Sequence, residues 1–160
     1  MMWILVAILT ALGGTALHFL YDVLPGPLTA LISPINESVW EHLKLLYWPM
    51  LLGASALAGH SREKRRLWSS FFVAVLFAPI FLLLCFYGLK ALGLESVVLD
   101  IALYYISIFA GYGLAWLLCK YRRLETYGGY WLMFVILYGA CLILFTFATP
   151  DLPIFKPISA

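Results

Sequence analysis

The chain has 160 residues, of which 64% are hydrophobic and only 11% are charged, and its mean hydropathy is +0.98. A soluble globular domain carries roughly 25% charged residues, so this composition excludes the soluble classes and makes nucleic acid an unexpected partner. A helix needs about 20 apolar residues to cross a bilayer. We therefore predict an all-α protein with a single transmembrane domain over residues 1–160 and the lipid bilayer as its surroundings.

Five apolar stretches are predicted to be transmembrane helices. They cover about residues 1–24, 38–59, 67–89, 97–118 and 128–149. The first stretch lacks the basic start of a signal peptide and is longer than its usual apolar core, so we interpret it as a retained helix. Pro25 and Pro27 end that helix. Residues 28–32 are apolar but too short to span, which places them at the interface or in a re-entrant turn.

Charge along the chain predicts the orientation of this bundle. Four of the ten Lys and Arg residues lie in residues 60–66 and three more lie in residues 120–127. With five spans, these two loops share one side of the membrane, and the positive-inside rule makes that side cytoplasmic. The N-terminus is then inside and the C-terminus outside, and most of the acidic residues lie at the outer end.

The three cysteines indicate no redox or metal chemistry. Cys85, Cys119 and Cys141 lie in or at the end of apolar runs, without C-x-x-C spacing or a neighbouring histidine. We expect them to pack as small apolar side chains. No cofactor is expected from the motifs of the chain, and a divalent cation is the one candidate left open.

The segment Asn36–Lys44 is the most polar part of the chain at the edge of an apolar run. Ionisable groups at the hydrocarbon boundary are costly and therefore suggest a function. Each also has a structural interpretation. Glu37 in a first helical turn favours the helix dipole, and Glu41 with Lys44 forms an i,i+3 ion pair.

The predicted topology brings further polar residues to the same depth as this segment. The candidate ligand- or proton-binding residues are His18, Asp22, Asn36, Glu37, Glu41, His42, Lys44 and Asp100. They are compatible with a divalent cation, a proton relay or a pocket for a small polar substrate. A metal, if bound, would use His18, Glu37, Glu41 and His42. Because no H-E-x-x-H motif is present, a polar pocket or relay is favoured over a tight metal site, and no catalytic residue is identified.

Two motifs carry a resemblance to a known family. The first predicted helix ends in His-Phe-x-Tyr at residues 18–21, and Pro-x-Asn-Glu-Ser-Val-Trp-Glu-His-x-Lys follows at residues 34–44. Over roughly residues 15–50 the chain resembles small multi-pass bacterial membrane proteins of unknown function. The resemblance implies a bacterial origin and a location in the cytoplasmic membrane. It implies no activity.

Three functions are compatible with these features. The favoured hypothesis is a binding or transport-type protein whose outer polar pocket binds or relays a proton, a cation or a small polar ligand. The first alternative is a structural or partner-binding bundle without a ligand. The second is a membrane-embedded, metal-assisted hydrolase with a carboxylate as general base, although the sequence favours a protein that is not an enzyme. The oligomeric state is not predicted.

Overall fold

The computed structural model describes residues 1–157 and confirms the predicted all-α class. Its helices are α1 (Met2–His18), α2 (Leu20–Val23), α3 (Pro27–Ala30), α4 (Val39–His42), α5 (Lys44–Gly59), α6 (Lys64–Ala91), α7 (Val97–Leu118) and α8 (Gly128–Phe147), with short 3₁₀ helices η1 (Arg122–Tyr127) and η2 (Pro153–Phe155). Within residues 1–157, β pairing is limited to one isolated bridge between Ser38 and Pro157.

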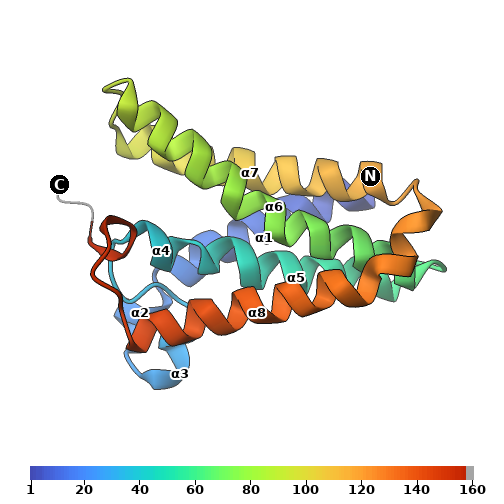
Figure 1. Ribbon diagram of the computed structural model, residues 1–160, viewed down its shortest axis with the longest axis horizontal. Helices are drawn as coiled ribbons and strands as arrows, with labels where there is room; N and C mark the ends of the chain where they lie inside the picture. Colours follow the sequence, from blue (N-terminus) through green and yellow to red (C-terminus); the bar gives the residue numbers. More distant parts are fainter. Residues whose placement is uncertain (158–160) are drawn as a thin grey trace.

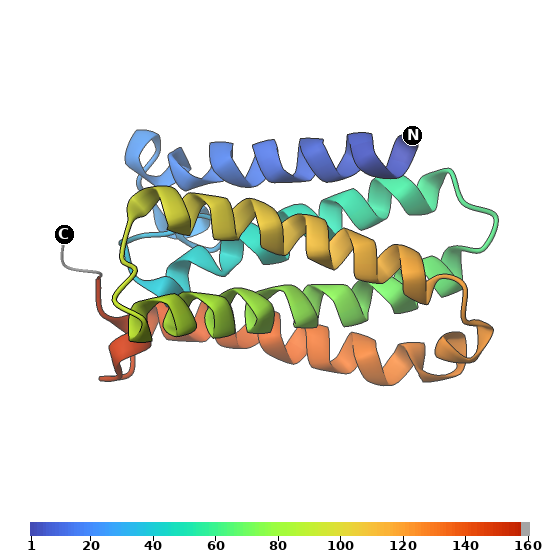
Figure 2. The same ribbon diagram turned by 90° about the horizontal axis from the view of Figure 1, so that it is seen from above.

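The long helices lie side by side and alternate in direction along the bundle (Figures 1 and 2). The N-terminus, the turn between α5 and α6, and η1 lie together at one end, which we call the basic end. The segment from α2 to α4, the turn between α6 and α7, and the C-terminal segment lie at the opposite end, which we call the polar end.

Four helical segments are long and apolar enough to cross a membrane: Met2–Val23, Lys64–Ala91, Val97–Leu118 and Arg122–Phe147. The remaining predicted span, residues 38–59, corresponds to α4 and α5, and α5 has only 16 residues. A fully apolar helix that crosses a bilayer alone needs about 20. Five spans and their orientation are therefore not established by helix length, and they stay a prediction.

Helix α5 nevertheless forms the core of the bundle. It packs against α1, α6 and α7, and its side chains Leu46, Met50, Ala54 and Leu57 are at most 1% exposed. Apolar residues of these neighbouring helices pack around α5, so most of its surface contacts protein. The polar segment that precedes it is thereby held at the centre of one end of the bundle.

The helix expected over residues 1–24 is interrupted at Phe19, where α1 ends and α2 begins. Ser33 explains the break. Its hydroxyl donates a hydrogen bond to the Leu17 carbonyl oxygen at 2.7 Å and accepts one from the Tyr21 backbone N–H at 3.1 Å. An uninterrupted helix would join that carbonyl and that N–H directly, and an inserted side chain is a known cause of such breaks.

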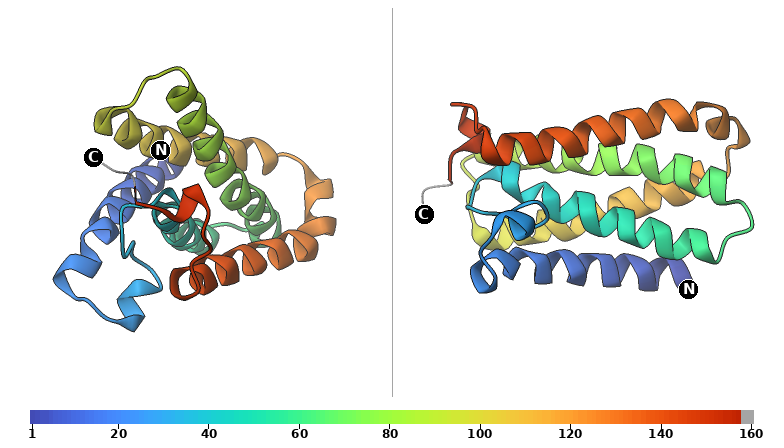
Figure 3. Two further views of the ribbon diagram at one scale, coloured as in Figure 1. Left: turned by 60° about the vertical axis from the view of Figure 1, so that its left-hand side comes forward. Right: turned by 90° about the horizontal axis from the view of Figure 1, so that it is seen from below.

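A second interruption at Leu43 separates α4 from α5, although one helix is expected over residues 38–59. The C-terminal segment covers α4 (Figure 3, left), and Phe155 packs on Trp40 with ring centroids 4.8 Å apart. The short helix α4 is thus enclosed between the bundle and the end of the chain.

Candidate functional site

The turn before α4 sets the direction of the polar side chains that follow. The Asn36 side-chain oxygen accepts a hydrogen bond from the Ser38 backbone N–H at 2.9 Å. Ser38 is the N-cap of α4, and its hydroxyl accepts from the Glu41 backbone N–H at 3.4 Å. Glu37 therefore precedes the helix, while Glu41 and His42 lie in its first turn and point in different directions because successive helical residues are about 100° apart.

Glu41 and Lys44 form a buried ion pair. Their side chains are 3% and 0% exposed, and Lys44 Nζ lies 2.6 Å from Glu41 Oε2. The ammonium group also donates to the carbonyl oxygens of Ala30 at 2.8 Å and Ser33 at 3.4 Å. Lysine has three N–H donors, so all of them have acceptors within the chain.

The Glu41 carboxylate is also satisfied on both oxygens. Besides Lys44, Oε2 accepts from the Ile35 backbone N–H at 3.0 Å. Oε1 accepts from the Thr146 hydroxyl of α8 at 2.9 Å. The pair thereby joins the α3 segment, the turn before α4, α5 and α8, and this arrangement supports a structural role for it.

Next to this pair, three side chains converge near the protein surface. The Nε2 atoms of His18 and His42 are 3.2 Å apart. Glu37 Oε2 lies 3.3 Å from His42 Nε2 and 3.9 Å from His18 Nε2. The side chains of His18 and His42 are 30% and 27% exposed, and that of Glu37 is 65% exposed. The group is thus anchored on α1 and α4 and open to solvent on one side.

One hydrogen bond determines the tautomer of His42, and with it the ring nitrogen whose lone pair is available to the cluster. His42 Nδ1 lies 2.8 Å from the Ser38 carbonyl oxygen. A carbonyl oxygen only accepts, so Nδ1 carries the hydrogen and Nε2 of the neutral ring has its lone pair directed at His18 and Glu37. His18 Nδ1 is buried and has no hydrogen-bond partner within the described residues 1–157.

The structure divides the residues that the sequence proposed as one site. It brings His18, Glu37 and His42 within ligand distance of one another, whereas Asp100, in the first turn of α7, lies at the same end but is not part of this group. Asn36 supports the turn backbone. Asp22 is exposed, and residues 1–157 supply it with no hydrogen bond or ion pair.

Sequence reasoning missed two serines at this end. The Ser33 hydroxyl interrupts the helix that begins with α1, and the Ser33 carbonyl oxygen accepts a hydrogen bond from Lys44. The Ser38 carbonyl oxygen orients His42. The Ser38-x-x-Glu41 spacing is the signature of a helix N-cap and is the signal that could have located the start of α4. No local pattern indicated Ser33, because its partner Leu17 lies 16 residues earlier.

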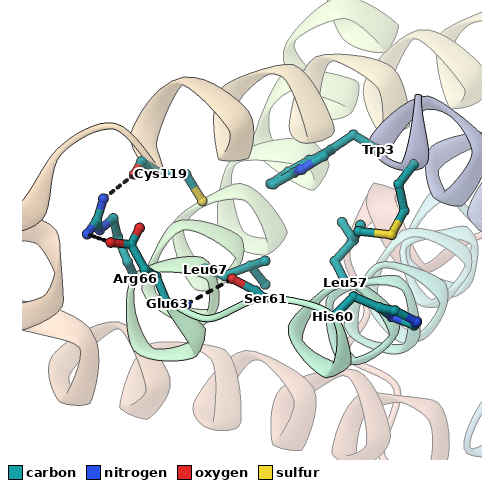
Figure 4. Close-up of a pocket in the computed structure, with 9 residues that line it drawn as sticks. Trp3, Leu57, His60, Ser61, Glu63, Arg66, Leu67 and Cys119 are labelled. Carbon is teal, nitrogen blue, oxygen red and sulfur yellow. Dashed lines mark hydrogen bonds and ion pairs between the residues drawn. The ribbon is translucent and has the colours of Figure 1, made fainter.

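A cavity of about 240 Å³ lies at the basic end (Figure 4). It is lined by Met2, Trp3, Leu57, His60, Ser61, Glu63, Arg66, Leu67 and Cys119. The Arg66 guanidinium group donates to Glu125 at 2.9 Å and to the Cys119 carbonyl oxygen, and it is ion-paired with Glu63. Arg66, the charged donor of this cavity, is already paired with the carboxylates of Glu63 and Glu125. The histidine cluster at the polar end is therefore the stronger candidate for a binding site.

Comparisons with known proteins give a family but no activity. No curated protein and no solved structure matches the chain. One family model matches residues 1–159, nearly the whole length, and its description states no function. The chain therefore belongs to the Family of unknown function (DUF6512).

Proposed function

We propose that this protein is a multi-pass membrane protein that binds a cation at its polar end through His18, Glu37 and His42. The observation that carries the proposal is the convergence of two imidazole nitrogens and one carboxylate oxygen, all within 4.8 Å of one another. All three groups are partly exposed, so an ion can reach them from solvent. This narrows the expected proton, cation or small polar ligand to a cation.

The charges around the cluster favour a cation over an anionic ligand. Glu37 belongs to the cluster, and Asp100, in the first turn of α7, is a second acid at the same end of the bundle. Lys44, the nearest positive charge along the chain, is fully buried and is neutralised by Glu41. A group of charges of one sign raises the local concentration of the opposite ion. The polar end is therefore suited to attract a cation.

We further propose five membrane spans, with the basic end in the cytoplasm and the polar end outside. The alternating direction of α1, α5, α6, α7 and α8 supports this topology, as does the concentration of Lys and Arg in residues 60–66 and 120–127. The family resemblance implies the bacterial cytoplasmic membrane. The binding site would then face the extracytoplasmic side, and residues 1–160 would form a single transmembrane domain.

A purely structural role is the second candidate, and the Glu41–Lys44 pair favours it for those two residues. Every donor of Lys44 and both oxygens of Glu41 are used within the chain. The same interpretation does not account for two histidines whose Nε2 atoms face each other beside a carboxylate at the surface. A metal-assisted hydrolase would need a cation at this site first, so one experiment addresses it as well.

The test is the thermal unfolding of the untagged protein in detergent, after treatment with a chelator, in the presence of Na⁺, Mg²⁺, Ca²⁺, Mn²⁺ or Zn²⁺. Binding to the folded state raises the melting temperature in a saturable manner. We expect at least one cation to do so in the wild type and not in Glu37→Ala. The matched control is Glu95→Ala, which removes another exposed acid at the same end. Absence of a shift with every cation contradicts the proposal.

A further inference from the structure

We infer that the cation of the proposed site is a transition-metal ion of the zinc type. Its ligands are His18 Nε2, His42 Nε2 and the Glu37 carboxylate. This inference rests on the proposed function and names the ion that the site selects. Three lines of evidence support it: the distances between the ligand atoms, their chemistry, and the groups that orient them.

The spacing of the three ligand atoms fits a small tetrahedral ion. Zinc bonds to imidazole nitrogen and carboxylate oxygen are about 2.0–2.1 Å long, so adjacent ligand atoms of a tetrahedral ion lie about 3.3 Å apart. The Nε2 atoms of His18 and His42 are 3.2 Å apart, and Glu37 Oε2 is 3.3 Å from His42 Nε2. The third edge, from Glu37 to His18, is 3.9 Å. Glu37 is exposed and needs only a small rotation to shorten it.

The ligand types separate zinc-like ions from calcium and magnesium. Imidazole nitrogen is a ligand for zinc, copper, nickel and iron. Calcium binds six to eight oxygen atoms, and magnesium requires octahedral oxygen coordination with several waters. Two of the three groups here are nitrogens, and one carboxylate alone is a poor calcium site. The cluster therefore selects against the alkaline-earth ions.

Groups around the cluster orient His42 in particular. The Ser38 carbonyl oxygen accepts from His42 Nδ1, which is the arrangement that fixes the tautomer of metal-binding histidines. Ser38 is in turn held by Asn36 and by the bridge to Pro157. His18 packs against Phe19 with ring centroids 5.0 Å apart. The His42 ring is thus oriented by hydrogen bonding without the metal, and the His18 ring is held by packing alone.

Three protein ligands leave one position of a tetrahedral ion open, as in catalytic rather than structural zinc sites. That position faces solvent, because Glu37 is 65% exposed and the two histidine side chains are 30% and 27% exposed. A water molecule or a small anion would complete the coordination. We therefore expect a metal that is bound reversibly and is accessible from outside the bundle.

The experiment is a titration of the chelator-treated, untagged, full-length protein with ZnCl₂, CaCl₂ and MgCl₂ by isothermal titration calorimetry. We expect one Zn²⁺ per chain and no binding of Ca²⁺ or Mg²⁺ at the same concentrations. Co²⁺ in place of Zn²⁺ is expected to give the intense visible absorption of a tetrahedral site. His18→Ala and His42→Ala should each weaken Zn²⁺ binding more than about tenfold, since even outer-shell changes cost that much.

The matched control is His60→Ala, which removes the remaining histidine, located at the basic end, and should leave Zn²⁺ binding unchanged. Glu37→Gln is the variant of choice if a histidine variant fails to fold, because Glu37 is exposed and precedes α4. It should weaken Zn²⁺ binding while the melting temperature without metal stays the same.

The outcomes separate this inference from the proposed function. Equal binding of Ca²⁺ and Zn²⁺ that depends on Glu37 overturns the inference and leaves the proposed function standing. Zn²⁺ binding that survives in the His18→Ala, His42→Ala double variant, or that is lost in His60→Ala, also overturns it. If no cation binds at all, both fall.

Discussion

Glu41 and His42 are neighbours in the chain, yet they serve different parts of the polar end. Glu41 is almost completely buried and bonds to Lys44, whereas His42 turns toward His18 and solvent. The two side chains point in different directions because adjacent residues of a helix are about 100° apart. One short helix thus contributes both to the internal scaffold and to the surface cluster that it supports.

The buried pair leads to a prediction about stability. Lys44→Met keeps the length of the side chain but leaves the Glu41 carboxylate buried without its cation. Removing one partner of a buried ion pair costs about 3–5 kcal/mol, so we expect a large fall in the free energy of unfolding, measured by denaturation in detergent. The Glu41→Gln, Lys44→Met double variant should recover much of this loss, because no uncompensated charge remains.

The exposed pair Lys156–Asp151 serves as the control for that measurement. Its side chains are 64% and 90% exposed, with Nζ and Oδ1 2.8 Å apart. Exposed pairs contribute little to stability, so Lys156→Met should leave the unfolding transition nearly unchanged. A Lys44→Met variant as stable as the Lys156→Met variant would contradict a structural role for the buried pair.

At the level of the helices, tyrosines of one helix pack into the space above glycines of another. A Cβ atom at Gly53 of α5 would overlap the Tyr112 hydroxyl of α7 and lie 2.5 Å from Thr10 Oγ1 of α1. The hydroxyls of Thr10 and Tyr112 are themselves hydrogen-bonded at 2.5 Å. Gly53 therefore permits the contact by which α1, α5 and α7 meet in the centre of the bundle.

We accordingly predict that Gly53→Ala is destabilising. Overpacking of a dense core costs about 1–3 kcal/mol, and here the added methyl group would also separate Thr10 from Tyr112. The matched control is Gly113→Ala in α7, where a Cβ meets no atom within 4 Å. Alanine is the better helix former, so this control should be neutral or slightly more stable in thermal unfolding. Equal melting temperatures for the two variants would contradict the prediction.

The helices themselves could be predicted from the sequence more completely than their interruptions. Helix α7 covers residues 97–118, the range of its apolar run, because Ser96 caps its start and no side chain from elsewhere in residues 1–157 breaks its backbone hydrogen bonds. The break at Phe19 depends on Ser33, which is brought to α1 by the turn after Pro27. No local periodicity contains that contact. Propensity and hydropathy describe a segment alone, and this break comes from another part of the chain.

The candidate site was predicted as a set of residues but not as two separate groups. Hydropathy and topology were sufficient to bring His18, Glu37, Glu41 and His42 to one end. Their division depends on the position of the N-cap at Ser38, which leaves Glu37 outside the helix and free to approach both histidines. If the helix began one residue earlier or later, the side chains of Glu37, Glu41 and His42 would point in other directions.

On the scale of the whole molecule, charge and apolar surface are segregated. Large apolar side chains are exposed along the outward sides of the long helices, among them Leu5, Ile80, Leu84, Ile106, Ile136 and Leu144. Exposed apolar area of this extent on a soluble protein would cause association. In a bilayer it is the surface that faces lipid, which agrees with four apolar helices of spanning length.

The side of the membrane on which the candidate site lies depends on how many helices cross the membrane. Cysteine labelling measures the number of crossing helices. In a background without Cys85, Cys119 and Cys141, we consider Ser61→Cys, between α5 and α6, and Glu95→Cys, between α6 and α7. If α5 crosses the membrane, an impermeant maleimide added to intact cells should label the variant at residue 95, and the variant at residue 61 only after permeabilisation.

Asp22→Cys, at an exposed position of the short helix α2, completes the experiment because it reports the orientation independently of α5. Five spans with the N-terminus inside predict labelling of intact cells at residues 22 and 95. An α5 that does not cross predicts labelling at residues 22 and 61. An inverted bundle predicts labelling at residue 61 alone. Only the first pattern places His18, Glu37 and His42 outside the cell on the same side as the turn between α6 and α7, where the cluster would take its cation from the external medium.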